Sequence, residues 1–369
     1  MLLQCRRRTS PRLRRPHPWL SHTPRHVSLL LAGTAAVLVL TTSAGAITPT
    51  AEFPKGEVDI TKDLAYAPAE PPDTQGHLLD LYVPRSRKPV PLAIFSSGSG
   101  WLADSGRRGA DEVAAHLNPH GFAVAGVAIR SSSQARFPAQ LHDIKGAIRW
   151  LRAHSKTYNL DPHRIAIMGD SSGGWTTAMA AVTGDIPQLE GDVGPRGPST
   201  TVQAAVPFYP PTDFLQMDAH MPDGCTTFNA VFGLTDCHAD ARSPESLLLG
   251  GPIKDRPGIV AAANPLTYIG DRHTPPFLIF HGKQDPFVPY HQGRLLFEKL
   301  AAAGNDARLI SFPHAGHGPF LDMLSDPDTR RDAYEEAAHH GQTTPARPVA
   351  LSWQTVLAFL EQRLKQTPR

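Results

Sequence analysis

The sequence predicts an α/β fold in which a mostly parallel central sheet is flanked by helices, with a small cap or excursion above the sheet. Two observations carry this prediction. Short apolar runs of strand length alternate along the chain with segments whose apolar residues recur at helical spacing. One run, Phe122 to Ile129, is apolar without interruption, which is typical of a strand buried on both faces. Strands that alternate with helices favour a parallel sheet with both faces covered.

The first half of the mature chain contains three predicted strands and one clear helix. Asp80 to Val83 alternates weakly and indicates an early strand, and the apolar run Leu92 to Phe95 leads into a Gly/Ser loop. After the strand at 122–129, Pro138 fits the first turn of a helix. The apolar residues behind it recur at helical spacing: Leu141, Ile144, Ile148 and Leu151.

The second half repeats the alternation and departs from it in two places. Its predicted elements are, in order, a strand in RIAIMGD, a helix in WTTAMAAV, strands in VQAAVPFY and PFLIFHG, a helix in YHQGRLLFEKLAAAG, a strand in ARLISFP and a closing helix in SWQTVLAFLEQRL. Residues 184–265 are rich in Pro and Gly, so a loop-rich excursion is expected there. Residues 325–348 are polar, and we expect a mobile or helical insertion in which His339 and His340 are solvated.

Residues 1–46 are expected to be a cleavable signal peptide. Seven arginines precede an apolar run from Val27 to Leu40, and Ala44-Gly45-Ala46 offers a small-residue cleavage site. The run is short for a membrane span, which needs about 20 apolar residues. Cleavage and secretion are therefore favoured over the alternative, a protein anchored in the membrane by an uncleaved signal. Residues 47–369 would then form a single domain.

Removal of this segment reverses the sign of the net charge. The full sequence carries a formal +2, and the segment holds seven arginines and no acidic residue, so the mature chain would carry −5. The basic balance of the full sequence therefore gives no indication of nucleic-acid binding. After signal cleavage we expect no stable association with a membrane.

Cysteine usage agrees with export. Cys225 and Cys237 are the two cysteines of the expected mature chain, and a pair in an oxidising compartment most simply forms a disulfide. Two buried free thiols are the alternative. Neither cysteine belongs to a CxxC or His-rich cluster, so no metal site is predicted.

Two serines stand side by side in the stretch MGDSSGGW, residues 168–175. Gly169-x-Ser171-x-Gly173 fits the nucleophile-elbow pattern, in which a strand turns so sharply into a helix that only small residues fit beside the serine. Ser172 would need a glycine at Asp170 and fails this test. Ser171 is therefore the predicted nucleophile, and an ordinary Gly/Ser turn is the structural alternative.

A serine hydroxyl needs a base, and the base needs an orienting carboxylate. Asp285 lies just beyond the strand in PFLIFHG, and His317 lies in a Gly-flanked loop after the strand in ARLISFP. His314 is a second candidate base. Asp306 precedes a strand, which places it at the wrong edge of the sheet for catalysis.

A developing oxyanion needs preorganised backbone donors, and one should be the N–H of Ser172, the residue after the nucleophile. The others are expected in SSGSGW, the loop after the strand at 92–95, from Gly98 and Ser99. An ordinary Gly/Ser turn is again the alternative for this loop.

These residues and several longer stretches resemble one family. The order Ser171, Asp285, His317 is that of an α/β-hydrolase. The matching stretches are LLDLYVP, SGSGW, FPAQLHDIKGAIRWLRAHSKTYNLDPHRIAIMGDSSGG, EGDVG, SPESLLLG, PPFLIFHGKQDPFVP and HAGHG. The chain resembles hormone-sensitive-lipase-like esterases with the α/β-hydrolase fold, closest to secreted bacterial feruloyl and acetylxylan esterases. The resemblance covers roughly residues 76–364 and implies one α/β-hydrolase catalytic domain.

One departure from the family concerns the oxyanion loop. The family commonly has His-Gly-Gly-Gly-Trp, where this chain has Ser97-Gly98-Ser99-Gly100-Trp101. Ser99 is expected to take a backbone angle that glycine adopts more easily, at a small local cost. Trp101 matches the family's aromatic residue and would either line the substrate pocket or pack under the loop. Asp170, at the family's acidic position beside the nucleophile, is expected to brace the elbow.

The resulting hypothesis is a secreted serine hydrolase that cleaves carboxylic esters through an acyl-enzyme. Its substrate would be an ester on a small molecule or a polymer, and no cofactor and no metal are implied. One alternative is a peptidase like the prolyl-oligopeptidase domains, although those usually carry a large propeller. A second is a catalytically silent binding module on the same fold. Acyl and alcohol specificity and the oligomeric state are not predicted.

Overall fold

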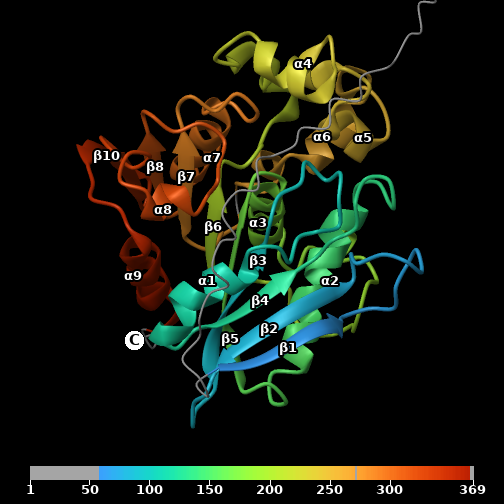
Figure 1. The fold of residues 1–369 in the computed structure, drawn as a ribbon, viewed down its shortest axis with the longest axis vertical. Helices are drawn as coiled ribbons and strands as arrows, with labels where there is room; N and C mark the ends of the chain where they lie inside the picture. Colours follow the sequence, from blue (N-terminus) through green and yellow to red (C-terminus); the bar gives the residue numbers. More distant parts are fainter. Residues whose placement is uncertain (1–57, 271, 366–369) are drawn as a thin grey trace, which may run out of the picture. The chain divides into compact units, whose positions relative to one another are not determined.

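A ten-stranded sheet runs through the residues that the computed structural model describes, 58–270 and 272–365 (Figure 1). The signal peptide expected at residues 1–46 lies outside them. The strands are β1 (Val58–Ala65), β2 (Leu78–Pro84), β3 (Val90–Ser96), β4 (Ala123–Val127), β5 (Leu160–Asp170), β6 (Ala204–Phe208), β7 (Phe277–Gly282), β8 (Ala307–Phe312), β9 (Tyr334–His339) and β10 (Gln342–Pro348). Their order across the sheet is β1-β2-β4-β3-β5-β6-β7-β8-β9-β10.

Parallel pairing occupies the middle of the sheet. Every neighbouring pair from β4 through β3, β5, β6 and β7 to β8 is parallel. The pairs at the two ends, β1 with β2, β2 with β4, β8 with β9 and β9 with β10, are antiparallel. The predicted mostly parallel sheet is confirmed. Because parallel strands end at the same edge, the loops after β3, β5, β7 and β8 meet there.

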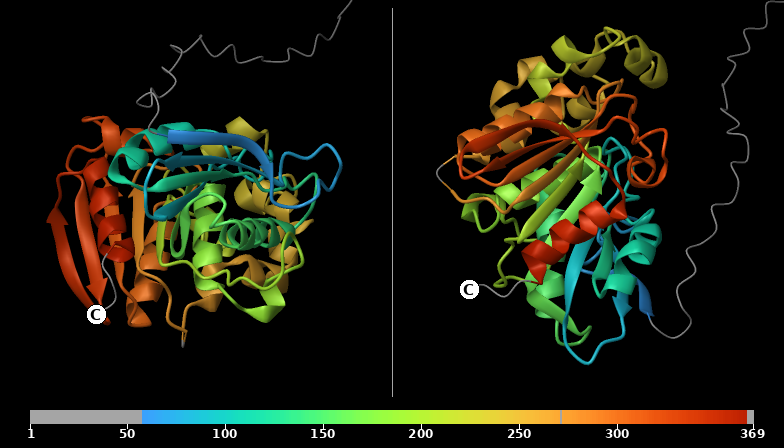
Figure 2. Two further views of the ribbon diagram at one scale, coloured as in Figure 1. Left: turned by 90° about the horizontal axis from the view of Figure 1, so that it is seen from below. Right: turned by 90° about the vertical axis from the view of Figure 1, so that its left-hand side faces the viewer.

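Helices cover both faces of this sheet (Figure 2). The α-helices of the described residues are α1 (Ala110–Leu117), α2 (Ala139–Ala153), α3 (Ser172–Val182), α4 (Thr226–Phe232), α5 (Pro244–Leu249), α6 (Pro257–Ala263), α7 (His291–Ala302), α8 (Asp322–Ser325) and α9 (Trp353–Leu364). Residues of α2, α3 and α7 pack into one apolar core, and residues of α1 and α9 pack into a second core.

The strand pattern explains why there are two cores. Successive side chains of a strand point to opposite faces. In β5, Ile165 and Ile167 belong to the core with α2 and α3, whereas Ala166 and Met168 belong to the core with α1 and α9. All four are almost completely buried, as the continuous apolar run of this strand predicts.

The expected insertion at residues 325–348 is instead mostly strand. β9 and β10 form an antiparallel pair that extends the sheet beyond β8. Every residue of β10 is exposed, so the strand lacks the alternation by which a half-buried strand is recognised. His339 is exposed as expected, but its Nδ1 also lies 2.7 Å from Asp306 Oδ1.

The excursion contains β6 and the helices α4, α5 and α6, and these helices gather at the top of Figure 1. A disulfide joins Cys225, immediately before α4, to Cys237, as predicted. Phe228 and Leu234 pack beside this disulfide in a small apolar cluster of their own. Among the described residues, no helix combines the length and apolar character needed to cross a bilayer.

Candidate active site

Ser171 occupies the sharp turn between β5 and α3. β5 ends at Asp170 and α3 begins at Ser172, so one residue makes the turn. Ser171 has φ 55° and ψ −123°, a conformation that residues with side chains rarely adopt. Its N–H donates to the carbonyl oxygen of Phe208, 3.0 Å away. The strained turn is the one that the elbow pattern requires.

The two glycines of the elbow are required by close backbone contact. A Cβ at Gly173 would lie 1.9 Å from the carbonyl oxygen of Ser96, and a Cβ at Gly169 would lie 2.4 Å from the same oxygen. Both distances are well inside van der Waals contact, and the contacted atom is backbone that cannot rotate away. The end of β3 therefore excludes any side chain at either position.

The structure brings the three predicted residues Ser171, His317 and Asp285 into one hydrogen-bonded chain. His317 Nε2 lies 3.0 Å from Ser171 Oγ, and His317 Nδ1 lies 2.8 Å from Asp285 Oδ2. If Nδ1 carries the ring proton and donates it to Asp285, Nε2 is free to accept the serine proton.

Asp285 is held from its other side. It is fully buried, and its Oδ1 accepts the backbone N–H groups of Phe287 at 2.9 Å and Val288 at 2.8 Å. These two bonds fix the plane of the carboxyl group, so Oδ2 stays directed at His317.

Aromatic rings and a second histidine surround this chain. The rings of Tyr209 and Phe287 pack against His317, with centroids 4.5 and 5.3 Å away. His281, at the end of β7, is buried and its Nε2 lies 2.9 Å from the Val288 carbonyl oxygen. Burial lowers the pKa of His281 to about 4, so the ring is neutral near pH 7. No motif in the sequence indicates a role for His281, because the strand pattern of PFLIFHG indicates burial only.

His314, the second candidate base, and Asp306 have other partners. His314 Nε2 pairs with the exposed carboxylate of Asp332 at 3.0 Å, and His314 does not line the cavity over Ser171. Asp306 pairs with His339 and with Arg363.

The loop after β3 lies directly on the elbow. A Cβ at Gly98 would be 2.7 Å from Ser171 Cβ and 3.2 Å from the backbone nitrogen of Ser172. Two loop N–H groups already have partners in this structure: Gly98 N–H donates to Asp170 Oδ1 at 3.2 Å, and Ser99 N–H donates to Ser172 Oγ at 2.9 Å. The second serine thus contributes its hydroxyl to the loop, which the sequence did not indicate.

Asp170 is the carboxyl group that accepts the Gly98 N–H of this loop. Burial raises its pKa, and the Gly98 N–H and the charge of His317 oppose that shift without cancelling it. Its bond to Gly98 agrees with the bracing role expected from the sequence.

The expected strain at Ser99 is wrong. Ser99 is not among the described residues with positive φ, and the left-handed angles fall one and two residues later, at Gly100 (φ 59°) and Trp101 (φ 57°). Trp101 is buried and packs edge-on against Trp175 and Phe214, with centroids 5.4 and 5.7 Å away. It also lines the cavity, so it combines the two roles that the sequence left open.

A cavity of about 640 Å³ opens over Ser171 and His317. One part of its wall comes from the oxyanion loop and the excursion, and the other from the start of α1 and the segment after His317. The lining residues include Trp101, Phe228, Phe232, Pro244, Glu245 and Phe287.

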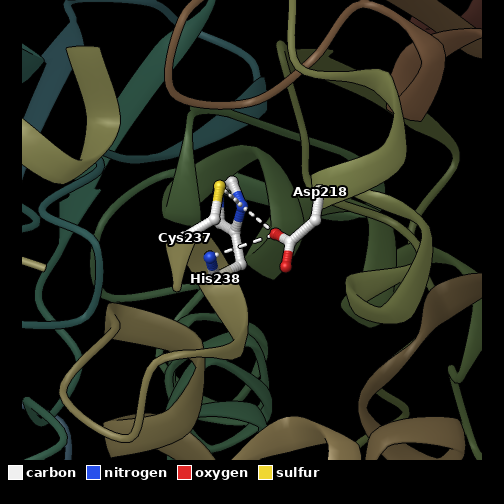
Figure 3. Close-up of side chains that lie close together, drawn as sticks. All are labelled: Asp218, Cys237 and His238. Atoms are coloured by element: carbon white, nitrogen blue, oxygen red, sulfur yellow. Dashed lines mark hydrogen bonds and ion pairs between the residues drawn. The ribbon is translucent and has the colours of Figure 1, made fainter. Parts of the chain in front are cut away.

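Asp218, Cys237 and His238 form a group of potential metal ligands within the described residues, with ligand atoms within 4.8 Å of one another (Figure 3). Cys237 Sγ is bonded to Cys225, so it offers no thiolate. His238 is occupied at both nitrogens, at Nδ1 by Asp218 and at Nε2 by the Phe287 carbonyl oxygen, each 2.9 Å away. The donor set does not fit a metal ion.

Known proteins match this chain along most of its length. The BD-FAE family model matches residues 79–300, and the Dienelactone hydrolase family model matches residues 262–364. Esterase LipC of Mycobacterium tuberculosis is 28% identical over 278 residues, which is 74% of this chain and 64% of LipC. Carboxylesterase NlhH of the same organism is 30% identical over 240 residues, 64% of this chain and 68% of NlhH.

The regions that match this chain span only part of the curated relatives: 64% of LipC, 56% of LipQ and 45% of LipM, all from Mycobacterium tuberculosis. Among solved structures, a truncated form of a carbohydrate esterase from gut microbiota is 27% identical with a TM-score of 0.66. That match covers 84% of this chain and 97% of the solved chain. The resemblance stated from the sequence is confirmed. Since the match at residues 79–300 extends over more than half of the 369 residues, the chain belongs to the BD-FAE family and has the α/β-hydrolase fold.

Proposed function

We propose that this protein is a secreted serine hydrolase that cleaves carboxylic esters through an acyl-enzyme. The observation that carries the proposal is the hydrogen-bonded chain from Asp285 through His317 to Ser171 Oγ, at the wall of a cavity of about 640 Å³. The names of the relatives, which are esterases, support the same chemistry.

The reaction follows from the geometry of these three residues. Ser171 Oγ attacks the ester carbonyl carbon, and its proton passes to His317 Nε2. The ester C–O bond then breaks, the leaving alcohol takes that proton, and the acyl group remains on Ser171. A water molecule gives a proton to His317 and attacks the acyl carbon, and the carboxylic acid leaves as the proton returns to Ser171 Oγ. Asp285 orients His317 and stabilises its charged form in both halves.

Backbone N–H groups of Ser172, Gly98 and Ser99 would stabilise the oxyanion. Ser172 N–H belongs to the first turn of α3, where N–H groups lack helical partners. Gly98 N–H makes a long bond to Asp170, which a charged oxygen could replace. Ser99 N–H is more firmly engaged with Ser172 Oγ, so it contributes only by sharing its hydrogen.

The proposed substrate is an ester on a small molecule or on an extracellular polymer. Secretion rests on the signal-peptide pattern of residues 1–46, and the solved carbohydrate esterase supports a polymer-borne ester. The names of the relatives favour neither the peptidase nor the silent binding module considered from the sequence.

The test compares purified wild type with Ser171→Ala on 4-nitrophenyl acetate and butyrate. We expect kcat to fall by at least about 10³-fold, because the nucleophile is lost. Ser133→Ala, a serine that does not line the cavity, is the matched control and should retain wild-type rates.

A fluorophosphonate probe gives a second readout. It should label wild type and Ser133→Ala but not Ser171→Ala, because only an activated serine is phosphonylated. Equal ester hydrolysis by wild type and Ser171→Ala, or a wild type that resists the probe, would refute the proposal.

A further inference from the structure

Glu245 is a buried carboxyl group on the cavity wall that the reaction does not use. It lies in α5 with 4% of its surface exposed, and its buried Oε2 has no hydrogen-bond partner among the residues that the structure describes. Glutamate side chains are rarely buried to this extent unless they are paired. A buried acceptor of this kind on the wall of the cavity over Ser171 is therefore a candidate substrate contact.

The backbone around Glu245 is fixed. Ser243 caps α5: its Oγ accepts the N–H of Ser246 at 3.0 Å and donates to the carbonyl oxygen of His238 at 2.6 Å. Pro244 lies against the oxyanion loop, since a Cβ at Gly100 would be 3.4 Å from its Cβ. Glu245 is thus held at a set position relative to the loop that faces Ser171.

His238 is a titratable neighbour whose charge acts on Glu245. Both ring nitrogens of His238 face oxygen acceptors, Asp218 Oδ1 and the Phe287 carbonyl oxygen, a pattern that only the doubly protonated imidazolium satisfies. Burial alone lowers the pKa of His238, but the carboxyl groups of Glu245 and Asp218 outweigh it and the pKa is raised. Burial raises the pKa of Glu245, and His238 opposes this. Burial outweighs this opposition, and the pKa of Glu245 stays above its ordinary value.

Aromatic side chains line the same cavity as Glu245. The Phe228 ring centroid lies 4.0 Å from that of His238, and Phe287 packs between Phe228 and His317. Glu245 lines the same cavity, and its Oε2 has no hydrogen-bond partner among the described residues, so a hydroxyl group carried by an apolar body bound against these rings is a suitable partner for it.

We propose that Glu245 is a specificity-determining residue that hydrogen-bonds a hydroxyl group carried by the ester substrate, while the neighbouring phenylalanines hold its apolar part. The inference rests on the proposed esterase function. The hydroxyl belongs to either the acyl half or the alcohol half of the ester, and the shared chemistry is a hydroxyl donor to a carboxyl oxygen.

The experiment uses two matched pairs of esters. Methyl 3-(4-hydroxyphenyl)propanoate and methyl 3-phenylpropanoate differ by a hydroxyl in the acyl half, and glycerol monobutyrate and propyl butyrate differ by hydroxyls in the alcohol half. We measure kcat and KM for wild type, Glu245→Leu and Glu245→Gln. Glu298→Leu, which removes an exposed glutamate of α7, is the control.

Wild type should prefer the hydroxylated member of one pair by at least about tenfold in kcat/KM, and the pair that shows it identifies the half of the ester. Glu245→Leu should lose that preference, and Glu245→Gln, which keeps a hydrogen-bonding oxygen, should retain most of it. A purely structural role for Glu245 would lower both rates of a pair together and leave the ratio unchanged.

An unchanged preference in Glu245→Leu, or a wild type that hydrolyses both pairs without preference, would overturn this inference alone. Absence of any ester hydrolysis by wild type would overturn the proposed function together with it.

Discussion

Replacing Asp285 by Asn should lower kcat/KM by about 10² to 10⁴-fold without unfolding the protein. Asp285 uses both oxygens: Oδ1 accepts two backbone N–H groups, from Phe287 and Val288, and Oδ2 accepts from His317 Nδ1. Asn has a single side-chain oxygen. That oxygen can accept either from the two backbone N–H groups or from His317 Nδ1, whereas the carboxylate accepts from both.

The magnitude follows from the cost of each choice. If the Asn oxygen faced His317, its amide group would point at two buried N–H donors, and each unsatisfied donor costs about 1 to 3 kcal/mol. A total of about 2 to 6 kcal/mol corresponds to a population factor of about 30 to 10⁴. The oxygen should therefore stay with the backbone and the amide should face Nδ1. His317 would then carry its proton on Nε2, where it cannot accept the proton of Ser171.

The assay is hydrolysis of 4-nitrophenyl butyrate at pH 7.5, with the thermal midpoint measured to confirm folding. Asp332→Asn is a matched control, because Asp332 pairs with the surface residue His314 at 3.0 Å and should not affect the rate. A folded Asp285→Asn variant with activity within tenfold of wild type would show that the carboxylate does not set the tautomer of His317.

Two further predictions concern stability. Because the pKa of His281 is about 4 in the fold against 6.5 ordinarily, the unfolded chain takes up its proton first. The contribution of His281 to the free energy of unfolding is fully present above pH 6.5 and falls by about 3 kcal/mol as the pH is lowered to 4. Urea titrations at pH 6.5 and pH 4 should show a pH dependence that is smaller by this amount in His281→Gln than in wild type. The same pH dependence in both proteins would contradict the lowered pKa of His281. Replacing both Cys225 and Cys237 by Ser removes a disulfide between residues 12 positions apart and should lower the free energy of unfolding by about 3 kcal/mol. The thermal midpoint should fall accordingly. An unchanged midpoint, or two titratable thiols in unreduced wild type, would contradict the disulfide.

The elbow could be predicted because its requirements are local. The tight turn requires glycine at positions 169 and 173, and the apolar run before them indicates β5. Residues close together in the sequence are therefore enough to predict the elbow. Asp285 and His317 were found for the same reason, since each follows a recognisable strand.

The polar surroundings of the site could not be predicted in this way. Glu245 meets the cavity only because α5 is folded back against the oxyanion loop, and the Ser172 hydroxyl finds the N–H of Ser99 across 73 positions of sequence. Neither contact leaves a periodic pattern. β10 was missed for a different reason: a strand exposed on both faces has no apolar alternation to reveal it.

The two outer strands of the sheet have a consequence for how copies of this protein behave toward one another. A long open sheet presents unpaired N–H and C=O groups at each edge, which can pair with a second chain and start aggregation. Here both edges are irregular: the register of β1 shifts between Thr61 and Leu64, and that of β10 shifts between Thr344 and Arg347. β10 also contains Pro345 and Pro348, which have no N–H to donate. The polar segment that looked like an insertion thus protects the exposed end of the sheet from pairing with another molecule.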